Sequence, residues 1–245
     1  MKAVALNMVE SPLPPILRPW RLSNKRLNGW IASLFMVGAA LFALGCVLFL
    51  LGSGDELLLD GIFFAGSLFF TSAAYCQLHQ LLTDRLGVTK SRTQWVQQAC
   101  NRETVDLSLM SAFAQFIGTL MFNVNTFDAF FDFNWFVQNL LVWSPNILGS
   151  ILFQLSGSLA IYEVSGRRWS WPSFKQRHDL LWWIGAINFI GCIAFLLSAL
   201  CSFVVPQVTL LRLVNGAVML TLLGACCFFV AAFLMWPAMR VEDNK

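Results

Sequence analysis

Charged residues are scarce in this 245-residue chain. Lys, Arg, Asp and Glu make up 12% of it, whereas 58% of the residues are hydrophobic. Soluble globular domains carry about 25% charged residues, because their surfaces face water. The shortage therefore excludes an ordinary soluble fold and places the chain in the membrane class.

Charges are also completely absent from six stretches of 21 to 32 residues. An α-helix needs roughly 20 apolar residues to cross the hydrocarbon core of a bilayer, and a lipid-facing barrel strand of about 10 would alternate instead. The stretches are 27–54, 61–83, 107–127, 133–162, 180–211 and 213–239. The sequence therefore predicts an all-α polytopic membrane protein with six transmembrane helices.

The basic residues predict the orientation of these helices. Fifteen of the sixteen Lys and Arg lie before the first stretch, after the sixth, or in the connections that follow the second and fourth stretches. The exception is Arg212. The positive-inside rule then places both termini in the cytoplasm, in a cell membrane of the bacterial inner-membrane kind. Short basic loops beside a membrane indicate lipid as the partner and no nucleic acid.

The alternation of connections predicts three helical hairpins. The expected order is a cytoplasmic N-terminal segment (1–29), hairpin 1 (30–82), a cytoplasmic loop (83–106), hairpin 2 (107–164), a second cytoplasmic loop (165–179), hairpin 3 (180–239) and a cytoplasmic tail (240–245). Each hairpin would begin and end on the same side, which excludes inverted repeats.

Glycine markers indicate that the hairpins are tandem copies of one unit. Each odd-numbered stretch has a β-branched residue, Gly, three residues and then Phe, and each even-numbered stretch has a small pair with another small residue eight positions later. Small residues let helices approach closely in lipid, so we expect these glycines at helix interfaces. They are Gly38, Gly118 and Gly191 in the odd stretches, and Gly66, Gly149 and Gly216 in the even ones. The alternative is that Gly and Phe are simply common in transmembrane helices.

A two-helix unit with Gly-x-x-x-Phe in its first helix and a Gly-Ser element in its second resembles the bacterial YrhK-like membrane domain. The resemblance covers single hairpins rather than the whole chain. It implies a membrane-embedded hairpin, and it supplies no activity, catalytic residue or cofactor.

Polar side chains distinguish the middle hairpin from the other two. They recur every four residues in the third stretch, and the fourth stretch carries further amides around Pro145, which removes a backbone hydrogen bond. The residues of this predicted polar pocket are Gln115, Thr119, Asn123, Asn139, Asn146, Ser150 and Gln154. The same residues could instead form hydrogen bonds between helices that contribute only to packing.

Two charges near the predicted outer boundary, Asp60 and Arg212, form a candidate structural ion pair between the second and sixth stretches. Neither of the two histidines has a Cys, Asp or Glu at a metal-ligand spacing, and no catalytic motif is present. We therefore expect no enzyme activity, no cofactor and no metal.

Two functions remain open from the sequence. The first is a non-enzymatic membrane protein that acts through helix association, as a structural or accessory subunit, with itself or with a membrane partner subunit. The second is a channel or carrier for a small polar or neutral solute, with the middle hairpin as its path. A transport path has to be at least partly hydrated past Gln115, Asn123 and Asn146.

Overall fold

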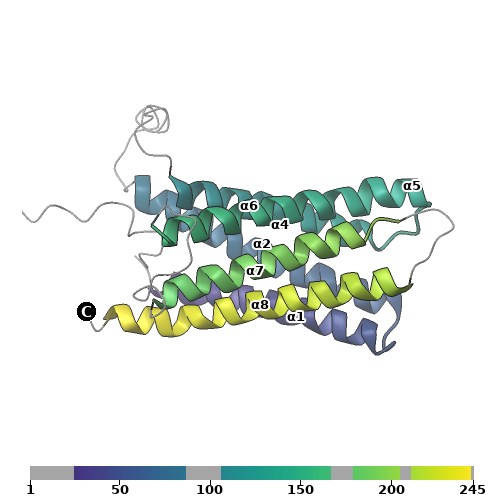
Figure 1. The fold of residues 1–245 in the computed structure, drawn as a ribbon, viewed down its shortest axis with the longest axis horizontal. Coiled ribbons are helices and arrows are strands. Elements are labelled where there is room, and N and C mark those ends of the chain that lie inside the picture. The colour runs from purple at the N-terminus through teal and green to yellow at the C-terminus, as the bar shows by residue number, and fades with distance from the viewer. Residues whose placement is uncertain (1–24, 87–105, 167–178, 205–210, 244–245) are drawn as a thin grey trace, which may run out of the picture.

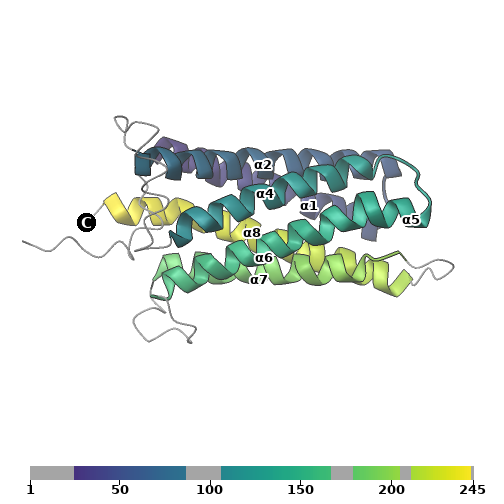
Figure 2. The same cartoon turned by 90° about the horizontal axis from the view of Figure 1, so that it is seen from above.

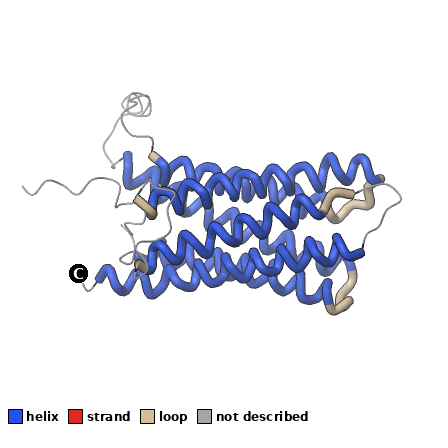
Figure 3. The backbone as a smooth tube through the Cα atoms, viewed as in Figure 1, coloured by secondary structure: helices blue, strands red, loops and turns tan. Residues whose placement is uncertain are grey.

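The computed structural model describes residues 25–86, 106–166, 179–204 and 211–243. Every regular element in these ranges is helical (Figure 3). The helices are α1 (Lys25–Leu50), α2 (Glu56–Leu86), α4 (Leu107–Asp128), α5 (Trp135–Gln138), the π-helical turn η2 (Asn139–Trp143), α6 (Ser144–Val164), α7 (Leu180–Cys201) and α8 (Leu211–Asp243).

Six helical segments of the described chain are long and apolar enough to cross a membrane, which confirms the predicted number. The fourth is continuous through α5, η2 and α6, from Trp135 to Val164. One difference from the predicted stretches is at α2, which begins at Glu56 rather than near residue 61. The backbone N–H of Leu58 donates to the Asp55 carboxylate at 2.8 Å. Charged residues thus occupy the first turn of this helix, and a search for uncharged stretches excludes them.

The six long helices form a closed ring in chain order. α1 packs on α2, α2 on α4, α4 on α6, α6 on α7 and α7 on α8, and α8 returns to α1. Figures 1 and 2 show the helices running side by side along one axis. We call the end with the start of α1 and the finish of α8 the terminal end, and the opposite one the distal end.

Glycines bring the helices together within three pairs: α1 with α2, α4 with α6, and α7 with α8. A Cβ atom added at Gly38 would lie 3.0 Å from the carbonyl oxygen of Gly66 on the partner helix. The corresponding distance is 3.1 Å from Gly118 to the Gly149 oxygen. It is also 3.1 Å from Gly224 to that of Gly191. A side chain at these positions would have to displace the partner helix, so glycine permits the close approach.

A layer of six phenylalanines fills the middle of the ring, one from each long helix. Each ring lies against a glycine of the partner helix in its pair. Neighbouring ring centroids are 5.0 to 6.0 Å apart, the range for favourable aromatic pairs. The members of this phenylalanine layer are Phe42, Phe70, Phe122, Phe153, Phe195 and Phe228, and all are buried.

The predicted packing glycine of the sixth helix was wrong. Gly216 has nothing within 4 Å of an added Cβ, whereas Gly224 meets both Gly191 and the Phe195 ring. At the level of Gly191, the residue of α8 that approaches α7 is Gly224, eight residues after Gly216. Gly224 also begins a Gly-x-x-x-Phe pattern in α8, which ends at Phe228.

Candidate functional site: two cavities on the axis of the ring

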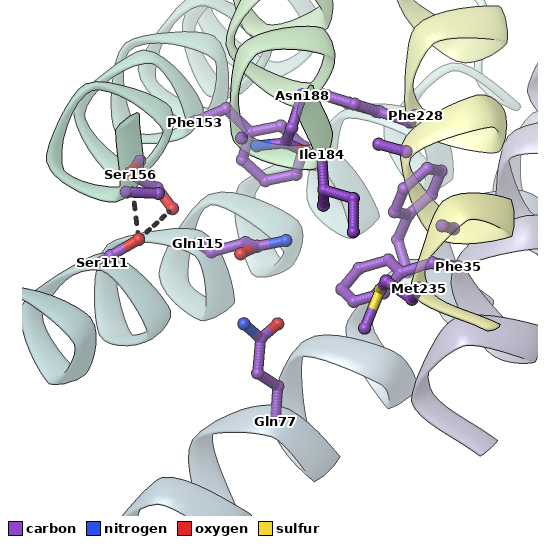
Figure 4. Close-up of a pocket in the computed structure, with 15 residues that line it drawn as sticks. Phe35, Gln77, Ser111, Gln115, Phe153, Ser156, Ile184, Asn188, Phe228 and Met235 are labelled. Atoms are coloured by element: carbon purple, nitrogen blue, oxygen red, sulfur yellow. Dashed lines mark hydrogen bonds between the residues drawn. The ribbon is translucent and has the colours of Figure 1, made fainter. Parts of the chain in front are cut away.

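A cavity of about 60 Å³ lies on the terminal side of the phenylalanine layer, and all six long helices contribute to its lining. We call it the terminal cavity. Gln77 of α2 and Gln115 of α4 extend into the same open space in Figure 4. Neither amide hydrogen-bonds to any residue that the structure describes. A third amide in the lining, Asn188, makes only a 3.9 Å contact with the Cys192 sulfur. Three amides from three helices are therefore available to a solute.

One wall of the terminal cavity is closed by a hydrogen-bonded serine pair. The Ser111 hydroxyl lies 3.0 Å from the Ser156 hydroxyl and 3.0 Å from the Ser156 carbonyl oxygen (Figure 4). Both side chains are buried and join α4 to α6. The rest of the lining is apolar and includes three rings of the phenylalanine layer, those of Phe70, Phe153 and Phe228.

A larger cavity of about 160 Å³ lies on the distal side of the layer, again lined by all six long helices. We call it the distal cavity. Its floor contains the other three rings of the layer, those of Phe42, Phe122 and Phe195. Its polar lining consists of Asp60, Asn125, Thr126, Asn146, Ser198, Ser202 and Thr221. The odd-numbered and even-numbered spans thus present their phenylalanines to opposite cavities.

Between the two cavities the layer is almost solid. The space left among its rings and Ser67 measures about 10 Å³. A water molecule needs roughly 10–15 Å³ of such space, and also polar partners. The terminal and distal cavities are therefore separated by an aromatic constriction whose remaining space is at the lower limit for a single water molecule.

A seven-residue step connects the layer to the terminal cavity. Seven residues are about two helical turns, so a residue at that interval lies on nearly the same helix face as its phenylalanine. One such step from each ring toward the terminal end reaches Phe35, Gln77, Gln115, Ala160, Asn188 and Met235. All six line the terminal cavity. The predicted site included Gln115 alone, although the step from the phenylalanines would have found Gln77 and Asn188.

The predicted polar pocket of the middle hairpin is not one pocket. Gln115 lines the terminal cavity and Asn146 the distal cavity, while the other five residues lie outside both linings. The Thr119 hydroxyl donates to the Phe116 carbonyl oxygen at 2.7 Å, and that of Ser150 to the Phe195 carbonyl oxygen at 3.4 Å. These two hydroxyls serve packing.

The remaining amides of that prediction also lie away from the axis. Asn139 holds the end of α7: its Nδ2 donates to the Val204 carbonyl oxygen at 2.7 Å, and its Oδ1 accepts from the Val204 N–H at 3.0 Å. Gln154 reaches Ser158 on its own helix at 3.4 Å. Asn123 Oδ1 and Gln154 Oε1 are buried without a hydrogen-bond partner. No two of the predicted amides bond to one another.

Asp60 lies in the lining of the distal cavity, whereas the side chain of Arg212 is outside the described part of the chain. The predicted ion pair between them therefore stays a prediction. Within the described ranges, no group of three His, Cys, Asp or Glu residues could hold a metal ion.

No family model, curated protein or solved structure matches this chain. The resemblance to the YrhK-like domain is therefore untested, and the cavities alone carry the functional inference.

Proposed function

We propose that this protein is a carrier or channel that moves a small polar solute across a membrane, along the axis of the six-helix ring. One observation carries the proposal: two polar cavities lie on opposite sides of a single aromatic layer, and every long helix lines both. A protein that served only to hold helices together would not need polar side chains without protein partners beside its axis.

In the arrangement described, the path is closed. A hydrophobic constriction with room for one water molecule at most blocks ions and polar solutes, which is how many channels gate. The rings that form the block lie against glycines, so small shifts of one helix along its partner would move a ring without breaking a hydrogen bond. In this proposal the phenylalanine layer is the gate, and the two cavities are solute-binding sites on either side of it.

The path differs from the one that the sequence suggested. It follows the ring axis and takes lining residues from three helix pairs, rather than running through the middle hairpin. Both helices of every pair carry Gly-x-x-x-Phe, at Gly38, Gly118 and Gly191 and again at Gly66, Gly149 and Gly224. This pattern supports three tandem hairpins arranged about one axis. The positive-inside rule supports a cytoplasmic terminal end.

The test is solute flux into liposomes that contain the purified full-length protein. Replacing Phe228 with alanine removes a ring that contacts three others in the layer, so glycerol and urea should enter faster than with the unchanged protein. Phe233→Ala is the matched control, because Phe233 is on the same helix and 54% exposed. Stopped-flow light scattering measures the shrinkage and recovery of the vesicles. Equal and background-level flux for all three proteins would refute a gated path.

Helix association with another subunit, the other function indicated by the sequence, has less support. The glycines of the three helix pairs contact helices of the same chain, so they are not free for a partner. Vesicles that stay impermeable with both variants, together with a stoichiometric partner in the detergent extract, would favour it.

A further inference from the structure

The hydroxyl groups of the distal cavity have already used their protons inside the protein. Thr126 donates to the Phe122 carbonyl oxygen at 2.8 Å, and Ser202 donates to that of Ser198 at 2.8 Å. The Thr126 oxygen also lies 3.0 Å from the Ser67 hydroxyl, which itself donates to the Phe64 carbonyl oxygen. In either hydrogen-bond arrangement the Thr126 proton stays within the helices. What these side chains offer to the cavity is lone pairs.

The remaining pair of hydroxyls behaves in the same way. Ser198 donates to the Ala217 carbonyl oxygen at 2.7 Å, and the Thr221 hydroxyl lies 3.1 Å from that oxygen and 2.7 Å from Ser198. The amide NH₂ of Asn125 donates to the Val142 carbonyl oxygen at 2.9 Å, so its Oδ1 remains available. Among the amides of this lining, Asn125 therefore keeps one uncommitted N–H and Asn146 keeps both. The distal cavity therefore offers more hydrogen-bond acceptors than donors.

Charge adds to this preference for donors. Asp60 contributes a carboxylate, and no Lys or Arg lines either cavity in the described chain. The floor and wall hold four aromatic rings, three from the phenylalanine layer and that of Phe63. Aromatic faces carry negative quadrupole density and attract cations. An anion or an acceptor-only solute would leave the oxygens unpaired, whereas a cation with several N–H groups would satisfy them.

The volume of the distal cavity indicates which kind of cation fits it. At roughly 10–15 Å³ per water, a cavity of this size holds several heavy atoms. A dehydrated alkali ion would touch only one side of it. We propose that the distal cavity binds a small primary ammonium ion, whose N–H groups donate to Asp60 and the neighbouring oxygens while its carbon chain lies on the phenylalanine floor. That this ion is also the transported solute rests on the function proposed above.

The test is calorimetric titration of the full-length protein in mild detergent with n-butylammonium chloride at constant ionic strength. We expect saturable binding that Asp60→Asn weakens by about tenfold or more, since hydrogen bonds to a charged group are the strong ones. Asp60→Glu should restore part of it. Glu56→Gln is the matched control, because Glu56 lies one turn earlier on α2, is exposed and is absent from the lining.

Competitors decide the chemical class. 1-Butanol should not displace butylammonium, and K⁺ should do so only weakly. Equal displacement by K⁺ would make this an inorganic cation site and overturn the proposal, as would unchanged binding to Asp60→Asn at an unchanged melting temperature. If the Arg212→Gln variant binds the amine and the unchanged protein does not, then Arg212 pairs with the Asp60 carboxylate in the unchanged protein. The proposal would then be wrong.

The binding test is independent of transport. Amine binding without flux in either phenylalanine variant would refute the path and leave the site. Flux through Phe228→Ala that is equal for butylammonium and glycerol, and unaffected by Asp60→Asn, would refute the cation preference and leave the path.

Discussion

The two cavities on the ring axis share their geometry but differ in chemistry. All six long helices line each, and each meets three rings of the phenylalanine layer. The smaller terminal cavity presents neutral amides that keep their N–H donors, whereas the distal cavity presents a carboxylate and oxygens whose protons are committed. A solute crossing the layer would thus pass from a charged, acceptor-rich site to a neutral, amide-lined one. If the proposed path exists, its two ends would therefore bind the same solute unequally.

The two cavities can differ in chemistry only while the phenylalanine layer separates them. Of the variants considered, Phe195→Ala should have the largest effect, because it opens the layer between the cavities. The Phe195 ring contacts those of Phe42, Phe122 and Phe228, and truncating a buried phenylalanine costs about 3–5 kcal/mol. A cysteine at position 115, in a chain without other accessible thiols, should then react with a membrane-impermeant reagent added at the distal side. In the otherwise unchanged chain it should react only from the terminal side.

Phe113→Ala provides the control for this experiment, since Phe113 is 57% exposed on α4. It should leave both the labelling side and the melting temperature unchanged. Distal labelling at position 115 without any change in the layer would mean that the two cavities are already one.

A smaller loss of stability is expected when a methyl group is added to the glycine against which a ring packs than when the ring itself is removed. Gly224→Ala would place a Cβ 2.5 Å from the Phe195 ring and 3.1 Å from the Gly191 carbonyl oxygen. Overpacking of this kind costs about 1–3 kcal/mol. Thermal unfolding in detergent measures it. Gly216→Ala on the same helix meets open space, so it should be neutral or slightly stabilising. Similar losses for both would contradict the assignment of Gly224 as the packing residue.

The difference in chemistry can be reduced without disturbing the layer by removing amides from the terminal cavity. Gln77 and Gln115 have no hydrogen-bond partner in the described structure, so the double replacement with leucine should change stability by less than about 0.5 kcal/mol. Flux of urea through Phe228→Ala should nevertheless fall, because the hydrogen bonds that replace its hydration are lost. Unaltered urea flux in the triple variant would show that these amides do not contact the solute.

The sequence predicted the six helices and three of the six phenylalanines in the layer. Missing charge located all six spans, and Gly-x-x-x-Phe located Phe42, Phe122 and Phe195. The marker used for the even-numbered helices was a pair of small residues with another small residue eight positions later, and taking the packing glycine from the pair selected Gly216 over Gly224. Scanning both helices of each hairpin for the same five-residue pattern would have completed the layer.

The cavities themselves could not be predicted from local patterns. The amide repeat in α4 includes Gln115, which lines the terminal cavity, but a period of four residues drifts around a helix, and Thr119 and Asn123 line neither cavity. Which faces meet at the axis depends on the contact of α8 with α1, and no sequence motif specifies that closure. Asp60 was predicted to pair with Arg212 because both residues stand near the outer boundary of the membrane, and no local pattern shows that Asp60 also lines a cavity.

The smallest effect on solute binding should come from the hydrogen bond that forms one wall of the terminal cavity. Ser111→Ala removes the link to Ser156, and hydrogen bonds between membrane helices average about 0.6 kcal/mol. The loss should be measurable in chemical unfolding but leave amine binding in the distal cavity unchanged. Ser72→Ala is the control, since the Ser72 hydroxyl is exposed and bonds only to Leu68 of its own helix. Weakened amine binding in Ser111→Ala would mean that the two cavities are coupled through α4, and each could then no longer be treated as a separate site.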